Sequence, residues 1–125
     1  MTWTAVDSSV LVAALSTWHE CHDEARAALE QAMGSGGGLV LPADSIVETY
    51  SVLTRLPSPH RLAPVDALRL IEENFADTRT VALAASDTWR LLRALANDRV
   101  AGGAVYDARI VAAAVKGGAS RILTL

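Results

Sequence analysis

The sequence is short of several residue types, and each shortage excludes a class of protein. Cys21 is the only cysteine among 125 residues, so no disulfide can form within the chain and we expect a reducing compartment. No apolar run approaches the ~20 residues that span a bilayer. The N-terminus has neither the basic start nor the apolar stretch of a signal peptide. We therefore expect a cytoplasmic protein without a membrane segment.

Positive charge is scarce as well. Eleven Lys and Arg residues stand against 14 Asp and Glu, which gives a net charge of -3 and no overall attraction for nucleic acid. Any binding of nucleic acid would need a local basic patch. Lys116 is the only lysine, so almost all the basic residues are arginine, which suits bidentate contacts with phosphate.

Apolar residues, by contrast, are abundant and periodic. They make up 51% of the chain, which excludes a disordered protein, and the length predicts one domain over residues 1–125. The expected strands cover residues 3–6, 39–41, 80–84 and 121–125. The expected helices cover residues 10–15, 19–33, 46–56, 64–75, 87–96 and 104–115. This alternation predicts an α/β fold with a parallel sheet covered on both faces.

Asp7 stands where the first expected strand ends, ahead of Ser8 and Ser9. Ligands of open α/β sheets bind just beyond the carboxyl ends of the strands, which makes Asp7 a candidate functional residue. Asp7 can equally serve as a helix cap that accepts hydrogen bonds from backbone N–H groups. The other caps we expect are Asp44 or Ser45, and Ser86, each ahead of a later helix.

Asp107 is the second candidate. Helical spacing aligns it with Val111 and Ala114 and places it beside Ile110, so we expect its carboxylate to lie against an apolar face. A buried carboxylate needs a cation, a metal or several donors. Alternatively, an acid in the first turn can serve only to complement the helix dipole.

Glu48 is the third candidate, and periodicity does not single it out. The buried side of its helix is marked by four apolar residues, Ile46, Val47, Tyr50 and Leu53. Glu48 falls on the polar flank, with Asp44, Ser45 and Ser51. By this pattern alone it is an ordinary exposed glutamate.

Five segments together resemble the PIN-domain ribonucleases, most closely the toxins of VapBC toxin–antitoxin systems. They are Val6-Asp7-Ser8-Ser9-Val10-Leu11-Val12, His19 with His22, residues 45–55, residues 102–114, and the closing Ile122-Leu123-Thr124-Leu125. The resemblance covers nearly the whole chain. It implies a three-layer α/β/α sandwich with a central parallel sheet.

The resemblance also implies a metal site and a reaction. The metal-binding acids of the family would fall on Asp7, Glu48 and Asp107, with Ser9 as a supporting hydroxyl. Neighbouring carboxylates stay ionised together when a cation lies between them, and Mg²⁺ or Mn²⁺ suits an all-oxygen site. The implied activity is endoribonuclease cleavage of RNA by metal-activated water, without a protein nucleophile. A cognate antitoxin and a homodimer are the implied partners.

The sequence departs from the family at its end. Family members continue past the last strand with an Asn or Asp that adds a fourth polar group, whereas this sequence stops at Leu125, where we expect the last strand to stop too. This departure leaves a catalytically degenerate PIN domain that binds protein or RNA as the alternative function. A phosphoacceptor receiver domain is a weaker alternative, because Asp7 stands alone and Lys116 precedes the final strand.

Other patterns favour structural interpretations. His19, Cys21 and His22 lack the spacing and the second cluster that a zinc site needs. The run from Gly34 to Gly38 lacks the Lys-Ser/Thr of a phosphate-binding loop and predicts a flexible connection. We interpret Trp18 and Trp89 as core or interface residues rather than platforms for base stacking. The dispersed arginines, Arg55, Arg61, Arg90, Arg93 and Arg99, are interpreted mainly as a solvated surface.

Overall fold

The computed structural model describes residues 2–34 and 36–125, and strands alternate with helices along them. The strands are β1 (Trp3–Val6), β2 (Gly38–Pro42), β3 (Arg79–Val81) and β4 (Ala119–Leu123). The helices are α1 (Ser8–Leu15), α2 (His22–Gly34), α3 (Ala43–Arg55), α4 (Pro64–Phe75), α5 (Ala85–Asn97) and α6 (Ala104–Lys116). No helix among these residues is long and apolar enough to cross a membrane.

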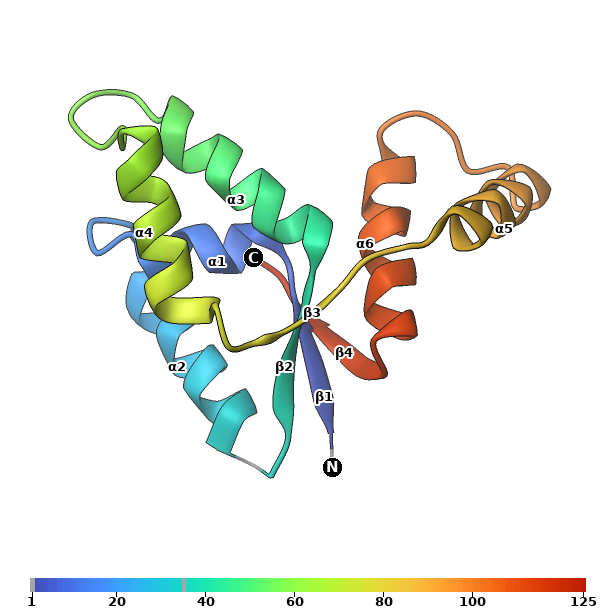
Figure 1. The fold of residues 1–125 in the computed structure, drawn as a ribbon, viewed down its shortest axis with the longest axis horizontal. Coiled ribbons are helices and arrows are strands. Elements are labelled where there is room, and N and C mark those ends of the chain that lie inside the picture. The colour runs from blue at the N-terminus through green and yellow to red at the C-terminus, as the bar shows by residue number, and fades with distance from the viewer. Residues whose placement is uncertain (1, 35) are drawn as a thin grey trace.

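The four strands form one parallel sheet in the order β3-β2-β1-β4. Helices α1 to α4 lie on one side of this sheet, and α6 lies on the other with α5 beyond it (Figure 1). This arrangement confirms the predicted α/β/α fold. Because β1 is central and parallel to its neighbours, the first strand ends at the same edge as β2 and β4, where ligands of such sheets bind.

The side of the sheet that faces α1 to α4 carries the larger core. Its buried aliphatic side chains come from strands and helices alike, among them Val6, Leu11, Leu29, Leu39 and Leu41. A second cluster joins α3 to α4 through Leu53, Ala67 and Ile71. This face therefore holds α1 and α3 firmly beside the ends of the strands.

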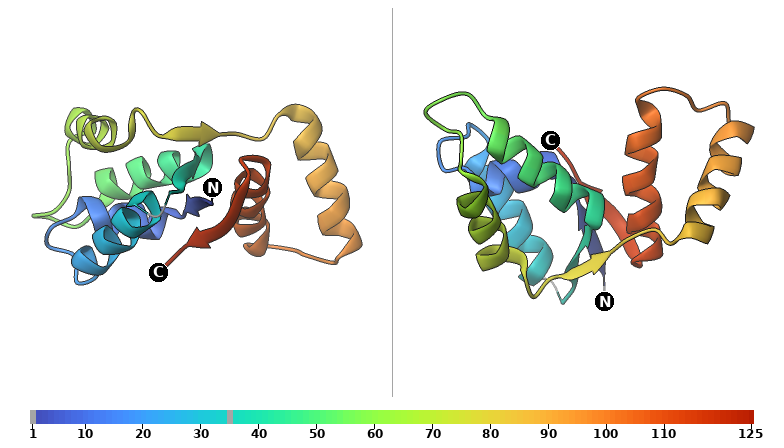
Figure 2. Two further views of the ribbon diagram at one scale, coloured as in Figure 1. Left: turned by 90° about the horizontal axis from the view of Figure 1, so that it is seen from below. Right: turned by 45° about the horizontal axis from the view of Figure 1, so that its top comes forward.

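The opposite face is packed with small residues. Ala113 and Ala114 of α6 are buried, and Gly117 follows directly after the helix. A Cβ atom at Gly117 would lie 2.6 Å from Cγ1 of Val40 and 3.1 Å from Cγ1 of Val81, so glycine lets the end of α6 approach the sheet closely. Helix α5 has one buried residue, Leu95, and stands away from the rest of the molecule (Figure 2). We call α5 and α6 together the α5–α6 arm.

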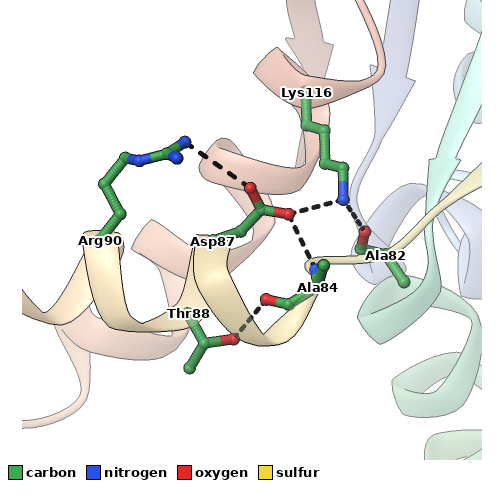
Figure 3. A network of polar contacts seen from close by, with 6 residues as sticks. All are labelled: Ala82, Ala84, Asp87, Thr88, Arg90 and Lys116. Atoms are coloured by element: carbon green, nitrogen blue, oxygen red, sulfur yellow. Dashed lines mark hydrogen bonds and ion pairs between the residues drawn. The ribbon is translucent and has the colours of Figure 1, made fainter.

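A polar network holds the start of α5 against the end of α6 (Figure 3). The ammonium of Lys116 donates to Oδ2 of Asp87 at 2.6 Å and to the carbonyl oxygen of Ala82 at 2.9 Å. Asp87 also accepts from the N–H of Ala84 at 2.8 Å, and Arg90 lies 3.7 Å from its other oxygen. The hydrogen bond from Lys116 is the largest cause that lowers the pKa of Asp87 below its ordinary value of 3.8.

Several predicted helix starts were wrong. Helix α3 begins at Ala43 with Pro42 as its N-cap, so Asp44 and Ser45 lie inside the first turn. Helix α5 begins at Ala85, and its N-cap is Ala84 instead of Ser86. The helix expected from residue 19 begins at His22, because residues 19–21 form a turn. In that turn, Nδ1 of His19 accepts from the N–H of Cys21 at 3.0 Å, which favours a turn over a helix.

The predicted buried side of α3 was only partly right, since Leu53 is buried and Ile46 packs against the core but the other two residues are exposed. Val47 is 67% exposed and Tyr50 is exposed, whereas Ser45 and Thr49 are buried. The hydroxyl of Thr49 donates to the carbonyl oxygen of Ser45 at 2.7 Å, and a small polar group satisfied within its own helix can be buried at little cost. Small side chains on this face let α3 pack closely against α1.

Candidate active site

Asp7 lies at the end of β1 and is the N-cap of α1, as predicted. Its own N–H donates to the carbonyl oxygen of Leu123 in β4 at 2.9 Å, and its Oδ1 accepts from the N–H of Ser8 at 2.8 Å. One carboxylate oxygen is therefore occupied by the helix start. The half-buried side chain is held between two neighbouring strands and the first turn of α1.

Two hydroxyl groups approach the other oxygen of Asp7. Thr124 Oγ1 donates to Oδ2 at 3.0 Å, and Ser9 Oγ donates to the same atom at 3.4 Å. The N–H of Leu125 in turn donates to Ser9 Oγ at 3.1 Å. The end of the chain thus lies beside the start of α1, as Figure 1 also shows. Ser9 contacts the carboxylate that it was predicted to support.

Thr124 is a site residue that the sequence analysis missed. We expected the last strand to reach Leu125, but β4 ends at Leu123, the residue paired with Val6 at the end of β1. Beyond that pair β1 turns into α1, so β4 has no strand to pair with. Thr124 and Leu125 therefore form a segment beyond the carboxyl end of β4. A hydroxyl residue straight after an apolar strand was the available signal.

The three predicted acids line one pocket with a volume of ≈ 490 Å³. Asp7 comes from the start of α1, Glu48 from the second turn of α3 and Asp107 from the first turn of α6. His19 and Glu20, from the turn ahead of α2, also line it. Three acids that lie far apart in the sequence thus face one hollow beyond the carboxyl ends of the strands.

The burial predicted for Asp107 was wrong. Asp107 is exposed, and so is Val111. The residues of α6 that are buried are Ile110, Ala113 and Ala114 instead. Glu48 is exposed as predicted, on the side of α3 that faces the pocket.

No basic side chain neutralises these acids among the described residues. None of the ion pairs in residues 2–34 and 36–125 involves Asp7, Glu48 or Asp107. The basic residue nearest to Asp107 in sequence, Arg109, pairs instead with Asp44 of α3 at 3.0 Å. With Glu20, the pocket therefore holds four carboxylates that form no ion pair within the described residues, which favours cations over anions there.

The donor set of the pocket fits a hard divalent cation. Carboxylate oxygens are the ligands that Mg²⁺ and Mn²⁺ prefer, and Mg²⁺ usually keeps several waters while it binds one or two carboxylates directly. Within the described part of the chain, no three His, Cys, Asp or Glu side chains are close enough together to hold an ion directly. The arrangement therefore suits a largely hydrated cation rather than one enclosed by three carboxylates.

Sequence comparison gives relatives over almost the whole chain. The PIN domain matches residues 4–125. Ribonuclease VapC40 of two Mycobacterium tuberculosis strains is 44% identical over 120 residues, which cover 96% of this chain and 84% of the relative. Ribonuclease VapC27 of Mycobacterium tuberculosis is 42% identical over 112 residues, which cover 90% of this chain and 77% of the relative.

Structural comparison gives the same fold. The crystal structure of Mycobacterium tuberculosis VapC20, a toxin that cleaves the sarcin–ricin loop, superposes with a TM-score of 0.70. The match covers 98% of this chain and 88% of that one at 18% identity, so it supports the fold alone. The family match and the identity to the two ribonucleases confirm the resemblance read from the sequence: this chain belongs to the PIN-domain family and is of the VapC type.

Proposed function

We propose that this protein is an endoribonuclease toxin that hydrolyses RNA at the pocket lined by Asp7, Glu48 and Asp107. The observation that carries the proposal is that Asp7, Glu48 and Asp107, from three distant segments, face one hollow at the carboxyl edge of the sheet and form no ion pair within residues 2–34 and 36–125. The ribonucleases VapC40 and VapC27, more than 40% identical to this chain, support the same reaction. We also propose that it acts in the cytoplasm, where its RNA substrate is present.

We further propose Mg²⁺ or Mn²⁺ as the cofactor, with Asp7, Glu48 and Asp107 as its ligands, directly or through water. When bound, such an ion polarises the phosphodiester and lowers the pKa of an attacking water. The protein's own part is to position groups. Thr124 and Ser9 fix the rotation of the Asp7 carboxylate, whereas the exposed Glu48 and Asp107 can turn toward the ion or its waters.

The proposed partners are RNA, a cognate antitoxin and a second copy of this chain. The antitoxin would restrain the nuclease by covering the acid pocket. The second copy would cover the α5–α6 arm, on which Trp89, Leu92, Tyr106 and Val115 are exposed. Exposed large apolar side chains are typical of protein interfaces.

The alternative function is a degenerate PIN domain that binds RNA or protein without cleavage. The absence of three directly converging metal ligands in the described part of the chain favours it. Calorimetric titration with Mn²⁺ separates the two functions. Specific uptake by the parent and its loss in Asp7→Asn support the nuclease, whereas heats that are equal in both proteins support the degenerate domain.

RNA cleavage tests the nuclease directly. We expect cleavage of total cellular RNA with Mg²⁺ or Mn²⁺, and a loss on the order of a hundredfold or more for Asp7→Asn and Asp107→Asn, because each removes charge stabilisation worth roughly 3 kcal/mol. Glu48→Gln should behave alike. The matched control is Glu72→Gln, an exposed acid on α4 outside the pocket, which should cleave at the parent rate.

Cleavage that persists in Asp7→Asn and Asp107→Asn would exclude the acid pocket as the active site. Circular dichroism melts of each variant, compared with the parent, show whether a loss reflects unfolding. Asp107 is exposed, so its substitution should leave the melting temperature nearly unchanged.

A further inference from the structure

A row of aromatic rings lies next to the acid pocket. The ring of Trp18 stacks on that of His60, with centroids 4.1 Å apart and an angle of 19° between the planes. The His19 ring also lies near Trp18, with centroids 5.7 Å apart and an angle of 45° between the planes. Trp18 is 46% exposed, so of the two roles expected for it, core or interface residue, the core is excluded. We call Trp18, His19 and His60 the aromatic row.

The aromatic row connects two hollows of the surface. His19 lines the acid pocket, while Trp18 and His60 line a neighbouring pocket of ≈ 250 Å³. Helix α3 forms a wall of both, with Glu48 in the first and Leu53 in the second. A chain-like ligand seated along α3 would therefore pass from the acids directly onto the exposed ring of Trp18.

Arginines flank this path. Arg55 follows Glu48 by seven residues, so it lies on nearly the same side of α3, about 10.5 Å further along the helix axis. Its Nη1 donates to Ser51 Oγ at 3.4 Å, which directs the guanidinium back along the helix. Arg61, in the loop after α3, is held by a 2.8 Å bond from Nε to the carbonyl oxygen of Leu56.

These two arginines carry positive charge that no acid takes up. Both are exposed, and neither takes part in an ion pair within residues 2–34 and 36–125. On a chain with a net charge of -3, such cations beside flat aromatic rings form a local site for phosphates and bases. For Arg55 and Arg61, this position favours a role in binding over the solvated surface that the sequence analysis expected.

We propose that the aromatic row is a binding subsite for single-stranded RNA, which rests on the proposed ribonuclease function. A base next to the scissile phosphodiester stacks on the Trp18–His60 pair, and Arg55 and Arg61 contact the phosphates on either side. Proteins read single-stranded RNA by stacking its unpaired bases on Trp and His rings, and each stacked base contributes strongly to affinity. The unpaired arginines favour a nucleic acid over an antitoxin segment at this surface.

Binding of a short fluorescein-labelled single-stranded RNA, measured by anisotropy, tests the subsite. All proteins carry Asp7→Asn so that the RNA stays intact. Trp18→Leu removes the ring but keeps an apolar side chain, and we expect it to weaken binding about tenfold. The matched control is Leu68→Ala, which trims an exposed apolar residue of α4 that lines neither pocket and should bind like the Asp7→Asn parent.

A second RNA of equal length, with abasic sites throughout, separates stacking from charge. Trp18→Leu should bind this RNA as the parent does, because no base is there to stack. Arg55→Ala should weaken binding of both RNAs severalfold, because it removes a phosphate contact. Arg69→Ala, which removes an exposed arginine from α4, is the matched control for charge.

Three results would overturn the subsite. The first is equal affinity of Trp18→Leu and the parent for the intact RNA, and the second is an equal loss on both RNAs. The third is a loss of affinity for the cognate antitoxin alone, which would make the aromatic row a protein-docking surface. If Trp18 is needed for RNA binding but the protein with its native Asp7 does not cleave RNA, the nuclease activity is overturned and the subsite stands.

Discussion

The two sides of the sheet are built differently. On the side of α1 to α4, large aliphatic side chains such as Leu11, Leu41 and Leu53 are almost completely buried. On the other side, alanines and a glycine bring α6 against the sheet, and Trp89 of α5 is 62% exposed. The first side therefore supplies most of the core, and buried apolar area is the main source of stability. The second side leaves apolar surface available to a partner.

The candidate site takes residues from both sides. Asp7 and Glu48 belong to helices that the larger core holds in place, whereas Asp107 belongs to the α5–α6 arm. The ion pair between Arg109 and Asp44, 3.0 Å long, joins α6 to α3 close to the acids. The position of the arm therefore sets how closely Asp107 approaches the other two acids. This division accounts for a pocket in which three acids face one hollow without direct convergence.

The largest expected effect on stability comes from the close approach of α6 to the sheet. Gly117 has φ −76°, which alanine adopts readily, so any penalty of Gly117→Ala comes from the 2.6 Å contact of its Cβ with Val40. We expect the free energy of unfolding to fall by about 1–3 kcal/mol. Urea unfolding followed by circular dichroism measures it.

The control for this prediction is Gly103→Ala. Gly103 also has an ordinary φ of −61°, and a Cβ atom there would have no neighbour within 4 Å. It should be neutral or slightly stabilising, because alanine reduces the entropy of the unfolded chain. Equal stability of the two variants would mean that α6 does not depend on close packing against Val40.

The next largest expected effect is on dimer formation through the exposed apolar residues of the α5–α6 arm. If a second copy covers it, Trp89→Glu places a charge in an apolar interface and should weaken the dimer at least about tenfold. Light scattering coupled to size-exclusion chromatography, over a range of concentrations, measures the dimer. Met33→Glu, at an exposed apolar residue of α2, is the matched control and should dimerise like the parent. A parent that is monomeric throughout this range would refute the dimer.

The order of elements could be predicted from the sequence because it follows from local periodicity. The helix over Pro64–Phe75 has the predicted bounds, since Pro64 starts it and its apolar side is regular. Asp7 was found because a carboxylate directly after an apolar run indicates a strand end. These signals depend only on neighbours in the chain.

The details that failed depend on tertiary contacts. On α3 the small residues Ser45 and Thr49 are buried, because this helix packs closely on α1. Periodicity had favoured Val47 and Tyr50 instead. Thr124 escaped notice because β4 ends where its partner β1 ends, and a pairing between distant strands is not visible in either one. The shared pocket of the three acids came from the family resemblance alone, since no pattern along the chain brings Glu48 to it.

The polar network between the start of α5 and the end of α6 gives the smallest expected effect on stability, and this effect depends on pH (Figure 3). Lys116 lowers the pKa of Asp87 in the folded protein, so the stabilisation is present above the unfolded value near 3.8 and is lost as the pH falls through the lower folded value. Lys116→Met should therefore destabilise the protein slightly near pH 7, and the difference from the parent should shrink below about pH 4.

Urea unfolding of the parent and Lys116→Met at a series of pH values tests this dependence. Arg26→Met is the control, because it breaks an exposed ion pair on α2, away from the arm. In this pair Nη2 of Arg26 lies 3.6 Å from Oε1 of Glu30. At pH 7, Arg26→Met should lower the free energy of unfolding less than Lys116→Met, because the latter also removes the hydrogen bond to the carbonyl oxygen of Ala82. A difference between parent and Lys116→Met that grows as the pH falls would have the wrong sign, and the arm would then be held by α6 packing alone.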